Sequence, residues 1–192
     1  MTSPFITYLK EFEQLNDVEQ QLIQSHLKFG RVPAKTFLLR AGDISNKIYF
    51  ILRGVVGDFY FDQQGNEIVK SFHAENQFVV DLTSYQQQGP SQFYFQALSD
   101  LEFVYFSKLS DQQLSRELPK WSSLVRRISE YLLAEKVDKA SFYLHLSAEQ
   151  RYQHFVASFP NLESRVQLGH VASFLGITQP SLSRIRKKLA LI

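Results

Sequence analysis

The 192-residue chain contains no cysteine, and this absence excludes several kinds of chemistry. Disulfides, thiolate zinc sites, cysteine-ligated iron–sulfur clusters and cysteine nucleophiles all require that side chain. A reducing compartment is compatible with such a composition, so we expect a cytoplasmic protein.

The chain also lacks the segments that direct proteins to membranes. No window approaches about 18 uninterrupted apolar residues, the length that a membrane-spanning helix needs. Residues 1–10 have no basic start followed by an apolar run, so no signal peptide is expected. We therefore expect no membrane partner.

Patterns typical of catalysis and metal binding are missing as well. We find no Gly-rich phosphate loop and no spaced nucleophile–base set, so we expect a protein that is not an enzyme. Three histidines, His73, His145 and His154, have the side chain that binds haem iron. Nothing else in the sequence supports that role, and a lone histidine is more often a surface or hydrogen-bonded residue. No pair of histidines has metal-ligand spacing, and we predict no metal or cofactor.

Acidic residues are missing from one end of the chain. Residues 164–192 carry 5 of the 21 basic residues and none of the 19 acidic ones, a net charge of about +5, while the whole chain has +2. The other residues therefore carry about −3, from 16 basic and 19 acidic side chains. This asymmetry favours a polyanionic partner at that end. A solvated basic helix end is the alternative.

Two spacing patterns divide the first part of the chain. In residues 5–29 apolar residues recur at steps of three and four, and Asn16 with Glu19 forms a capping-box pattern. From residue 37 to 107 short β-branched and aromatic runs alternate with turn signals, such as residues 62–66 and Gly89-Pro90. The second pattern predicts an antiparallel barrel or sandwich. Its strands are expected at residues 48–52, 55–61, 68–72, 78–80, 93–97 and 101–106.

Helical spacing returns from Ser110. An apolar stripe, extended less regularly by Val137 and Phe142, can run more than five turns without Gly or Pro. Such a helix either covers its own barrel or also pairs with a second copy in a homodimer, and we favour the second interpretation. The candidate dimerisation residues are Leu124, Ile128, Tyr131 and Leu132. Another helix is expected from Ser147 to Pro160.

Residues 166–189 have the spacing of a helix-turn-helix. Leu168, Val171, Ala172 and Leu175 form one short amphipathic helix, and Gly176 follows as the flexible residue of the turn. Thr178 is placed to cap a second helix. The inner face of that helix consists of Leu182, Ile185 and Leu189.

The polar face of the second helix carries residue types that suit a DNA groove. Gln pairs with adenine, Arg with guanine and Ser with several bases, while Lys contacts phosphate. A helical hairpin with a solvated face is the alternative, but the acid-free basic composition favours double-stranded DNA. The candidate DNA-binding residues are Gln179, Ser181, Ser183, Arg184, Lys187 and Lys188.

The sequence resembles the Crp/Fnr family of regulators over nearly the whole chain. The family is named for the cyclic-AMP receptor protein and the fumarate–nitrate regulator. Residues 40–43 (Arg-Ala-Gly-Asp), 48–51 (Ile-Tyr-Phe-Ile) and Gly54 are similar to the family's first barrel signature. Residues 135–137 (Glu-Lys-Val) match its central helix near the hinge. Residues 182–185 (Leu-Ser-Arg-Ile) resemble the most recognisable part of its DNA-reading module.

The resemblance implies an α+β fold in three parts. An N-terminal antiparallel β-roll of the cyclic-nucleotide-binding type would occupy residues 1–116, a long central dimerisation helix residues 117–143, and a helix-turn-helix domain residues 144–192. It also implies a homodimer that reads two DNA half-sites and works with RNA polymerase. By the same resemblance Gln179, Ser183 and Arg184 contact bases, and Ser181, Lys187 and Lys188 contact phosphates.

The sequence departs from the family at the effector pocket. The family's Gly-Glu pair for ribose is replaced by Val80-Asp81, and its Arg-Ser pair for phosphate by Ser91-Gln92. The Thr-Ser pair that touches the base in cyclic-AMP sensors is replaced by Leu133-Ala134. A phosphate diester needs a donor to offset its desolvation, so cyclic nucleotides are not expected. The candidate pocket residues are Val80, Asp81, Leu82, Ser91, Gln92 and Leu133.

Two further expectations stay open. Many aromatic residues in this region suit either an unknown small-molecule effector or a collapsed pocket. The family's β-hairpin wing would start at Leu191-Ile192, so we expect a short or missing wing and weaker non-specific DNA affinity. The leading hypothesis is a dimeric DNA-binding regulator with an atypical effector pocket. The alternative is a ligand-sensing interaction module that no longer binds DNA.

Overall fold

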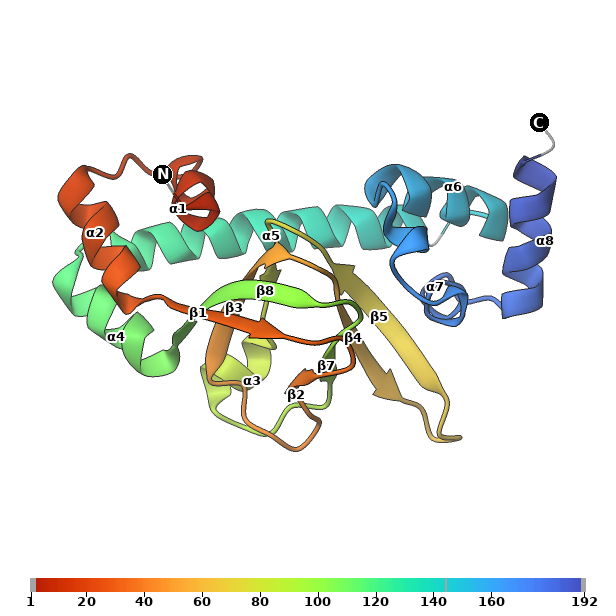
Figure 1. The fold of residues 1–192 in the computed structure, drawn as a ribbon, viewed down its shortest axis with the longest axis horizontal. Helices are drawn as coiled ribbons and strands as arrows, with labels where there is room; N and C mark the ends of the chain where they lie inside the picture. Colours follow the sequence, from red (N-terminus) through yellow and green to blue (C-terminus); the bar gives the residue numbers. More distant parts are fainter. Residues whose placement is uncertain (1–2, 144, 191–192) are drawn as a thin grey trace.

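The computed structural model describes residues 3–143 and 145–190, with the side chains of all these except residues 138–142. Three parts follow one another along the longest axis, with helices at both ends and a β-barrel between them (Figure 1). A single long helix, α5 (Trp121–Tyr143), connects the two helical ends. The α+β fold class predicted from the sequence is confirmed.

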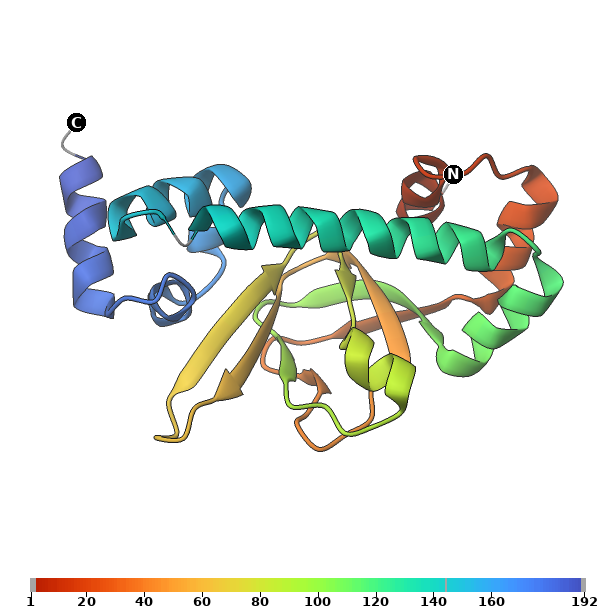
Figure 2. The ribbon, with the colours of Figure 1, turned by 180° about the vertical axis from the view of Figure 1, so that it is seen from behind.

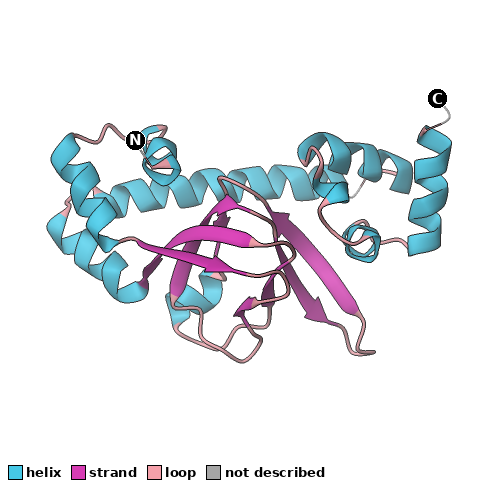
Figure 3. Cartoon of the chain, viewed as in Figure 1, coloured by secondary structure: helices cyan, strands magenta, loops and turns pink. Residues whose placement is uncertain are grey.

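The barrel consists of two four-stranded antiparallel sheets, shown in magenta in Figure 3. Their strand orders are β1-β8-β3-β6 and β2-β7-β4-β5. Side chains such as Ile51, Val56, Phe95 and Phe103 from both sheets fill the interior, since alternate residues of a strand point to the same face. The strands are β1 (Lys28–Val32), β2 (Phe37–Leu39), β3 (Lys47–Arg53), β4 (Val56–Phe61), β5 (Glu67–His73), β6 (Phe78–Val79), β7 (Tyr94–Ala97) and β8 (Leu101–Ser107).

The N-terminal helices are α1 (Pro4–Lys10) and α2 (Asp17–His26). The predicted capping box is confirmed, because the Asn16 side chain accepts from the Glu19 N–H and the Glu19 carboxylate accepts from the Asn16 N–H. The helical region was expected to reach residue 29, but α2 ends at His26 and β1 begins at Lys28. Pairing of β1 with β8 decides the structure there.

The central helix α5 begins at Trp121, after α4 (Lys108–Glu117), and lies along the barrel in both views (Figure 2). The Trp121 indole donates to Asp111 Oδ1 at 2.9 Å, which fixes the start of α5 against α4. Leu124 and Ile128 are buried in a core shared with α1, α2 and β3. The first turns of α5 therefore cover the molecule's own barrel.

The C-terminal end is formed by α6 (Ala148–Ser158), a 3₁₀ turn η1 (Leu162–Ser164), α7 (Leu168–Phe174) and α8 (Gln179–Leu189). The expected start at Ser147 is confirmed, and Ser147 forms a capping box with Gln150. None of the described helices is long and apolar enough to cross a membrane. The expected wing would start at residues 191–192, which lie outside the described residues.

Candidate nucleic-acid interface

The turn between α7 and α8 has the geometry that the sequence predicts. Gly176 adopts a φ of +66°, a conformation that L-residues rarely adopt. The Ile177 N–H donates to Ala172 O at 3.0 Å, and Thr178 Oγ1 accepts from the Ser181 N–H at 3.3 Å as the helix cap. Leu182 is fully buried between the helices. The predicted helix-turn-helix spacing is therefore confirmed as a local structure.

The outer face of α8 is open to solvent. Gln179, Ser183, Arg184, Lys187 and Lys188 are exposed. The remaining candidate, Ser181, is half-buried, and its hydroxyl lies 2.9 Å from Thr178 Oγ1. In Figures 1 and 2 α8 lies at the extreme end of the molecule, with α7 and α6 between it and the barrel. The barrel does not cover this face.

Two surface ion pairs hold basic residues of α8 against its own domain. Lys188 Nζ lies 2.6 Å from Glu149 Oε2 on α6, and Arg186 Nε lies 3.8 Å from Glu163 Oε2. Exposed pairs of this kind contribute at most about 1 kcal/mol. Lys188 can therefore exchange Glu149 for another anion at small cost, while Arg184 and Lys187 already point to solvent.

The helix-turn-helix is docked on the barrel through α7. Ser173 Oγ on α7 donates to Glu67 O and accepts from the Val69 N–H, both at 2.9 Å, so it hydrogen bonds to the main chain of β5. His170 Nε2 lies 3.3 Å from Glu67 Oε1. This attachment holds the helical domain by its inner side.

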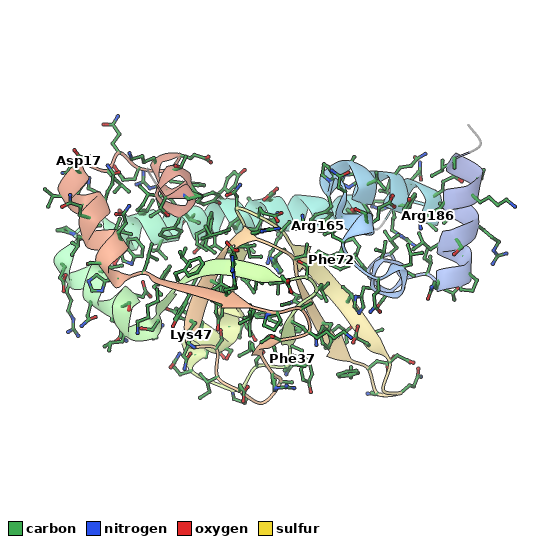
Figure 4. The ribbon with its side chains drawn as sticks, viewed as in Figure 1. Asp17, Phe37, Lys47, Phe72, Arg165 and Arg186 are labelled. Carbon is green, nitrogen blue, oxygen red and sulfur yellow. The ribbon has the colours of Figure 1, made fainter. Side chains whose placement is uncertain are left out.

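An ion pair and an aromatic cluster complete the contact between the two domains. Arg165 binds both carboxylate oxygens of Glu75, at 3.0 and 2.5 Å, and Glu75 also accepts from the Gly54 N–H at 2.8 Å. The hydrogen bond from Arg165 lowers the pKa of Glu75 to about 2. Figure 4 shows Phe72 and Arg165 at this boundary. The Phe72 ring contacts the rings of Phe155, Phe159 and Phe174.

The sequence and the fold are similar to those of known regulators. The "Anaerobic regulatory protein" of Haemophilus influenzae is 25% identical over 195 residues, which cover 95% of this chain and 72% of that protein. The "cAMP-activated global transcriptional regulator CRP" of Salmonella typhimurium is 24% identical over 62% of this chain and 58% of its own length. The solved c-di-GMP-responsive regulator CLP of Xanthomonas campestris is 20% identical, with a TM-score of 0.68 over 89% of this chain and 90% of its own. No family profile matches the chain.

The chain is therefore similar to regulators of the Crp/Fnr type over nearly its whole length. Its β-roll has the fold of the cyclic-nucleotide-binding type of domain. The chain spans 72% of the anaerobic regulator and 58% of CRP.

Two of the candidate pocket residues, Asp81 and Ser91, take part in a closed hydrogen-bond network. Asp81 and Ser91 are both buried, and Ser91 Oγ donates to Asp81 Oδ2 at 2.7 Å. Asp81 Oδ1 accepts from the Ser84 N–H at 3.2 Å, which caps α3 (Leu82–Gln87). Ser84 Oγ donates to Gly89 O at 2.6 Å. Asp81 and Ser91 therefore satisfy each other.

The other candidate pocket residues are not gathered around that network. Gln92 and Leu82 are exposed, Leu133 is exposed on α5, and Val80 packs against the core around α1 and α5. A pocket of about 540 Å³ adjoins this network, since Gly42 and Asp43 of its lining form main-chain hydrogen bonds with Ser91, but none of the six candidate residues lines it. Among the described residues no cluster could hold a metal ion.

The four residues of α5 that were expected to form the dimer contact differ in their exposure. Leu124 and Ile128 are buried in the core of their own chain. A second copy cannot reach a buried side chain, so we correct the expectation that these two residues form the dimer contact. Leu132 is half-buried, and Tyr131 is exposed with its ring 5.4 Å from that of Phe12. The apolar residues of α5 that stay exposed include Leu133 and Val137.

Two groups of residues were missed at the level of sequence. The contacts of Arg165, His170 and Ser173 with the barrel join positions about 90 to 106 residues apart, and no local pattern signals them. The other group is a buried polar cluster of Asp58, Ser71 and His73. A signal was present for the cluster, since polar residues interrupt apolar runs of the two strands.

Proposed function

We propose that this protein is a sequence-specific, DNA-binding transcription regulator in which α8 enters the major groove. The observation that supports it is the exposed, acid-free face of α8, held outward by a helical domain that is docked through α7. Recognition helices of this class present their N-terminal residues to base edges. Both named relatives are described as regulators.

We assign base contacts to Gln179, Ser183 and Arg184. Arg184 suits the two acceptors of guanine, and Gln179 suits adenine. Lys187 and Lys188 follow on the same helix and suit phosphates, with Lys188 leaving Glu149 on binding. The Ser181 N–H caps α8 on Thr178 Oγ1, so the proposed phosphate contact is made by the Ser181 hydroxyl, which leaves Thr178 on binding.

The proposed regulator is a homodimer that does not respond to cyclic AMP. A second copy fits the exposed part of α5, and two copies of α8 would read two half-sites related by two-fold symmetry. RNA polymerase is the partner expected at a promoter. A cyclic phosphate has no basic side chain to meet at Asp81 and Ser91, which bind each other.

Binding to promoter fragments at two salt concentrations tests the proposal. We expect the native chain to bind with a marked salt dependence, and Arg184→Ala to weaken binding to the preferred site by roughly 1–3 kcal/mol. Arg126→Ala is the matched control, since Arg126 is an exposed arginine on α5 paired with Glu130, and it should bind normally. Equal binding by all three proteins would contradict the assignment. No binding by any of them would favour the ligand-sensing module.

A further inference from the structure

The helical domain (α6 to α8) is attached to one strand of the barrel at separate places, of which the first is an exposed strand edge. The strand is β5, which lies at the edge of its sheet because the strand order is β2-β7-β4-β5. An edge strand has main-chain groups without a strand partner. Ser173 on α7 binds two of them, since its hydroxyl donates to Glu67 O and accepts from the Val69 N–H, both at 2.9 Å. A hydroxyl can do both at once, so Ser173 takes the place of a neighbouring strand.

The second attachment lies beyond the other end of β5. Glu75 follows the last residue of the strand, His73, by two positions and accepts from both terminal nitrogens of Arg165, at 3.0 and 2.5 Å. The Gly54 N–H also donates to this carboxylate, at 2.8 Å, and holds it in place. The strand rises roughly 13 Å from Val69 to His73. The two attachments are therefore well separated along one strand.

A cluster of aromatic rings lies between the two attachments. Phe72 of β5 is buried, and its ring centre lies 5.3 to 6.4 Å from those of three rings on α7, on α6 and at the end of α6. These rings belong to Phe174, Phe155 and Phe159. Because the rings come from two helices, the cluster opposes rotation of the domain about the line that joins the other two attachments.

Helix α8 is held to α7 and α6 within the helical domain. Leu182 of α8 is fully buried in the apolar core that α7 and α8 share. On the other side of α8, Lys188 pairs with Glu149 and Arg186 with Glu163, both in the same domain. The position of α8 relative to the barrel is therefore set by the attachments of the domain to β5.

This position matters when two half-sites are read together. Half-sites of a two-fold symmetric operator lie roughly 34–36 Å apart. In Figure 1 α8 lies beyond the C-terminal end of α5, so a two-fold axis parallel to α5 puts both copies of α8 at the same end of a dimer. A helical domain that swings freely matches the required spacing only part of the time. It then loses part of the gain from engaging both half-sites at once.

We propose that Glu75 and Ser173 are positioning residues for the reading of DNA. Together with Arg165 they hold the helical domain so that two copies of α8 match two half-sites, and neither Glu75 nor Ser173 touches DNA itself. The inference rests on the proposed DNA-binding function. Loss of either attachment weakens binding to two half-sites and leaves binding to one half-site unchanged, because the outer face of α8 stays the same.

Affinities for duplexes with one and with two half-sites test the proposal. The sites are selected from random sequence with the native chain. We expect Glu75→Gln and Ser173→Ala to weaken binding to two half-sites roughly tenfold and binding to one by less than about twofold. Glu102→Gln is the matched control, since it makes the same change of charge at a barrel carboxylate paired with Arg31, and it should bind both duplexes like the native chain. Arg184→Ala should weaken binding to both duplexes.

A distance measurement between two copies tests the same attachment without DNA. The chain has no cysteine, so Lys187→Cys creates a single site for a spin label on the exposed face of α8. We expect a narrow distribution of distances between the two labels of a dimer, and a broader distribution when Glu75→Gln is added. Sedimentation should show equal dimerisation with and without Glu75→Gln, because Glu75 does not lie on α5.

Three results overturn the assignment of Glu75 and Ser173. One is an unchanged ratio of the two affinities in both variants, which would mean that α5 alone sets the position of α8. The others are a broad distance distribution without Glu75→Gln and a weaker dimer with it, since lost association would then explain the lower affinity. If Ser173→Ala does not fold, Glu75→Gln decides.

The same measurements separate this inference from the proposed function. If the native chain binds neither duplex, the DNA-binding function is wrong, and the positioning role is wrong with it. If the native chain binds and Arg184→Ala weakens binding, but Glu75→Gln and Ser173→Ala keep the native ratio, only the positioning role is wrong.

Discussion

Gly176 shows how one residue sets the angle between α7 and α8. Its φ of +66° is left-handed, and a Cβ added there meets no atom within 4 Å. A side chain at this position would therefore strain the backbone conformation without clashing with a neighbouring atom. We expect Gly176→Ala to lower the free energy of unfolding by about 1–2 kcal/mol, measured by urea denaturation.

The neighbouring glycine of the same domain provides the control. Gly169 lies in α7 without a positive φ, and a Cβ there would make one ordinary contact, with Gln179 Oε1 at 3.7 Å. Gly169→Ala should therefore be neutral or slightly stabilising, because alanine favours helix more than glycine does. An equal loss of stability in both variants would mean that the turn does not depend on the conformation of Gly176.

The ion pair of Arg165 and Glu75 gives the domain contact a pH dependence. The pKa of Glu75 falls from 4.5 to about 2 on folding. A lowered pKa contributes stability that is present above pH 4.5 and is lost as the pH falls toward 2. The pair is partly exposed, so we expect only about 1 kcal/mol.

Arg165→Ala should remove most of that acid-dependent loss. Denaturation of the native chain and the variant at pH 7 and pH 3 gives the comparison. The difference in unfolding free energy between the two proteins should be larger at pH 7 than at pH 3. If the difference in unfolding free energy were larger at pH 3 than at pH 7, the pH dependence would not come from the pair of Arg165 and Glu75.

At the scale of elements, one ring makes the aromatic part of the contact between β5 and the C-terminal helices. Phe72 is buried and packs against Phe155, Phe159 and Phe174. Replacement by leucine keeps an apolar side chain but loses ring contacts and leaves a cavity. We expect Phe72→Leu to destabilise the chain by about 1–3 kcal/mol, measured by chemical denaturation.

Phe29→Leu on β1 separates this effect from the loss of an aromatic residue in general. Phe29 is 63% exposed, so its replacement should change stability by less than about 0.5 kcal/mol. Similar losses at both positions would show that Phe72 is not the residue that joins the domains.

The elements that the sequence predicted are those with strong local signals. Every expected strand between residues 48 and 106 lies within two residues of an observed one, because alternating apolar runs and turn residues are local features. Helix α3 was missed, since Leu82–Gln87 is mostly polar and depends on the cap from Asp81. Strand β1 was missed because its structure comes from pairing with β8 far along the chain.

The candidate site was predictable to a similar degree and for similar reasons. The exposed face of α8 follows from spacing and charge alone. The burial of Leu124 and Ile128 under α1 does not, because an apolar stripe looks the same whether its own chain or a second copy covers it. The mutual hydrogen bond of Asp81 and Ser91 needed the folded positions of two loops.

At the scale of the whole molecule, the arrangement separates three surfaces. The pocket is lined by residues of β2, β3 and β7 on the barrel. Helix α8 lies at one end of the molecule, and α5 runs along the barrel toward that end (Figure 1). Arg165, His170 and Ser173 join the barrel to the domain that carries α8. Ser173 and His170 thereby fix α7 to β5.

Measurements of self-association test whether a second copy binds to the exposed part of α5. Leu133 and Val137 are four residues apart, so they share one face of the helix, and both are exposed. A charge placed there would be desolvated in a dimer but solvated in a monomer. We expect Leu133→Glu to raise the dimer dissociation constant at least roughly tenfold without changing the Tm of the isolated monomer, as measured by sedimentation and by thermal unfolding at low concentration.

Leu109→Glu is the matched control for that substitution. Leu109 on α4 is 63% exposed, the same fraction as Leu133, and the change in net charge is identical. If Leu109→Glu dissociates the dimer as strongly, the effect comes from overall charge and the second copy does not sit on α5. If only Leu133→Glu does so, binding to DNA with two half-sites should fall with it, because a monomer contacts one half-site and loses the gain from simultaneous engagement.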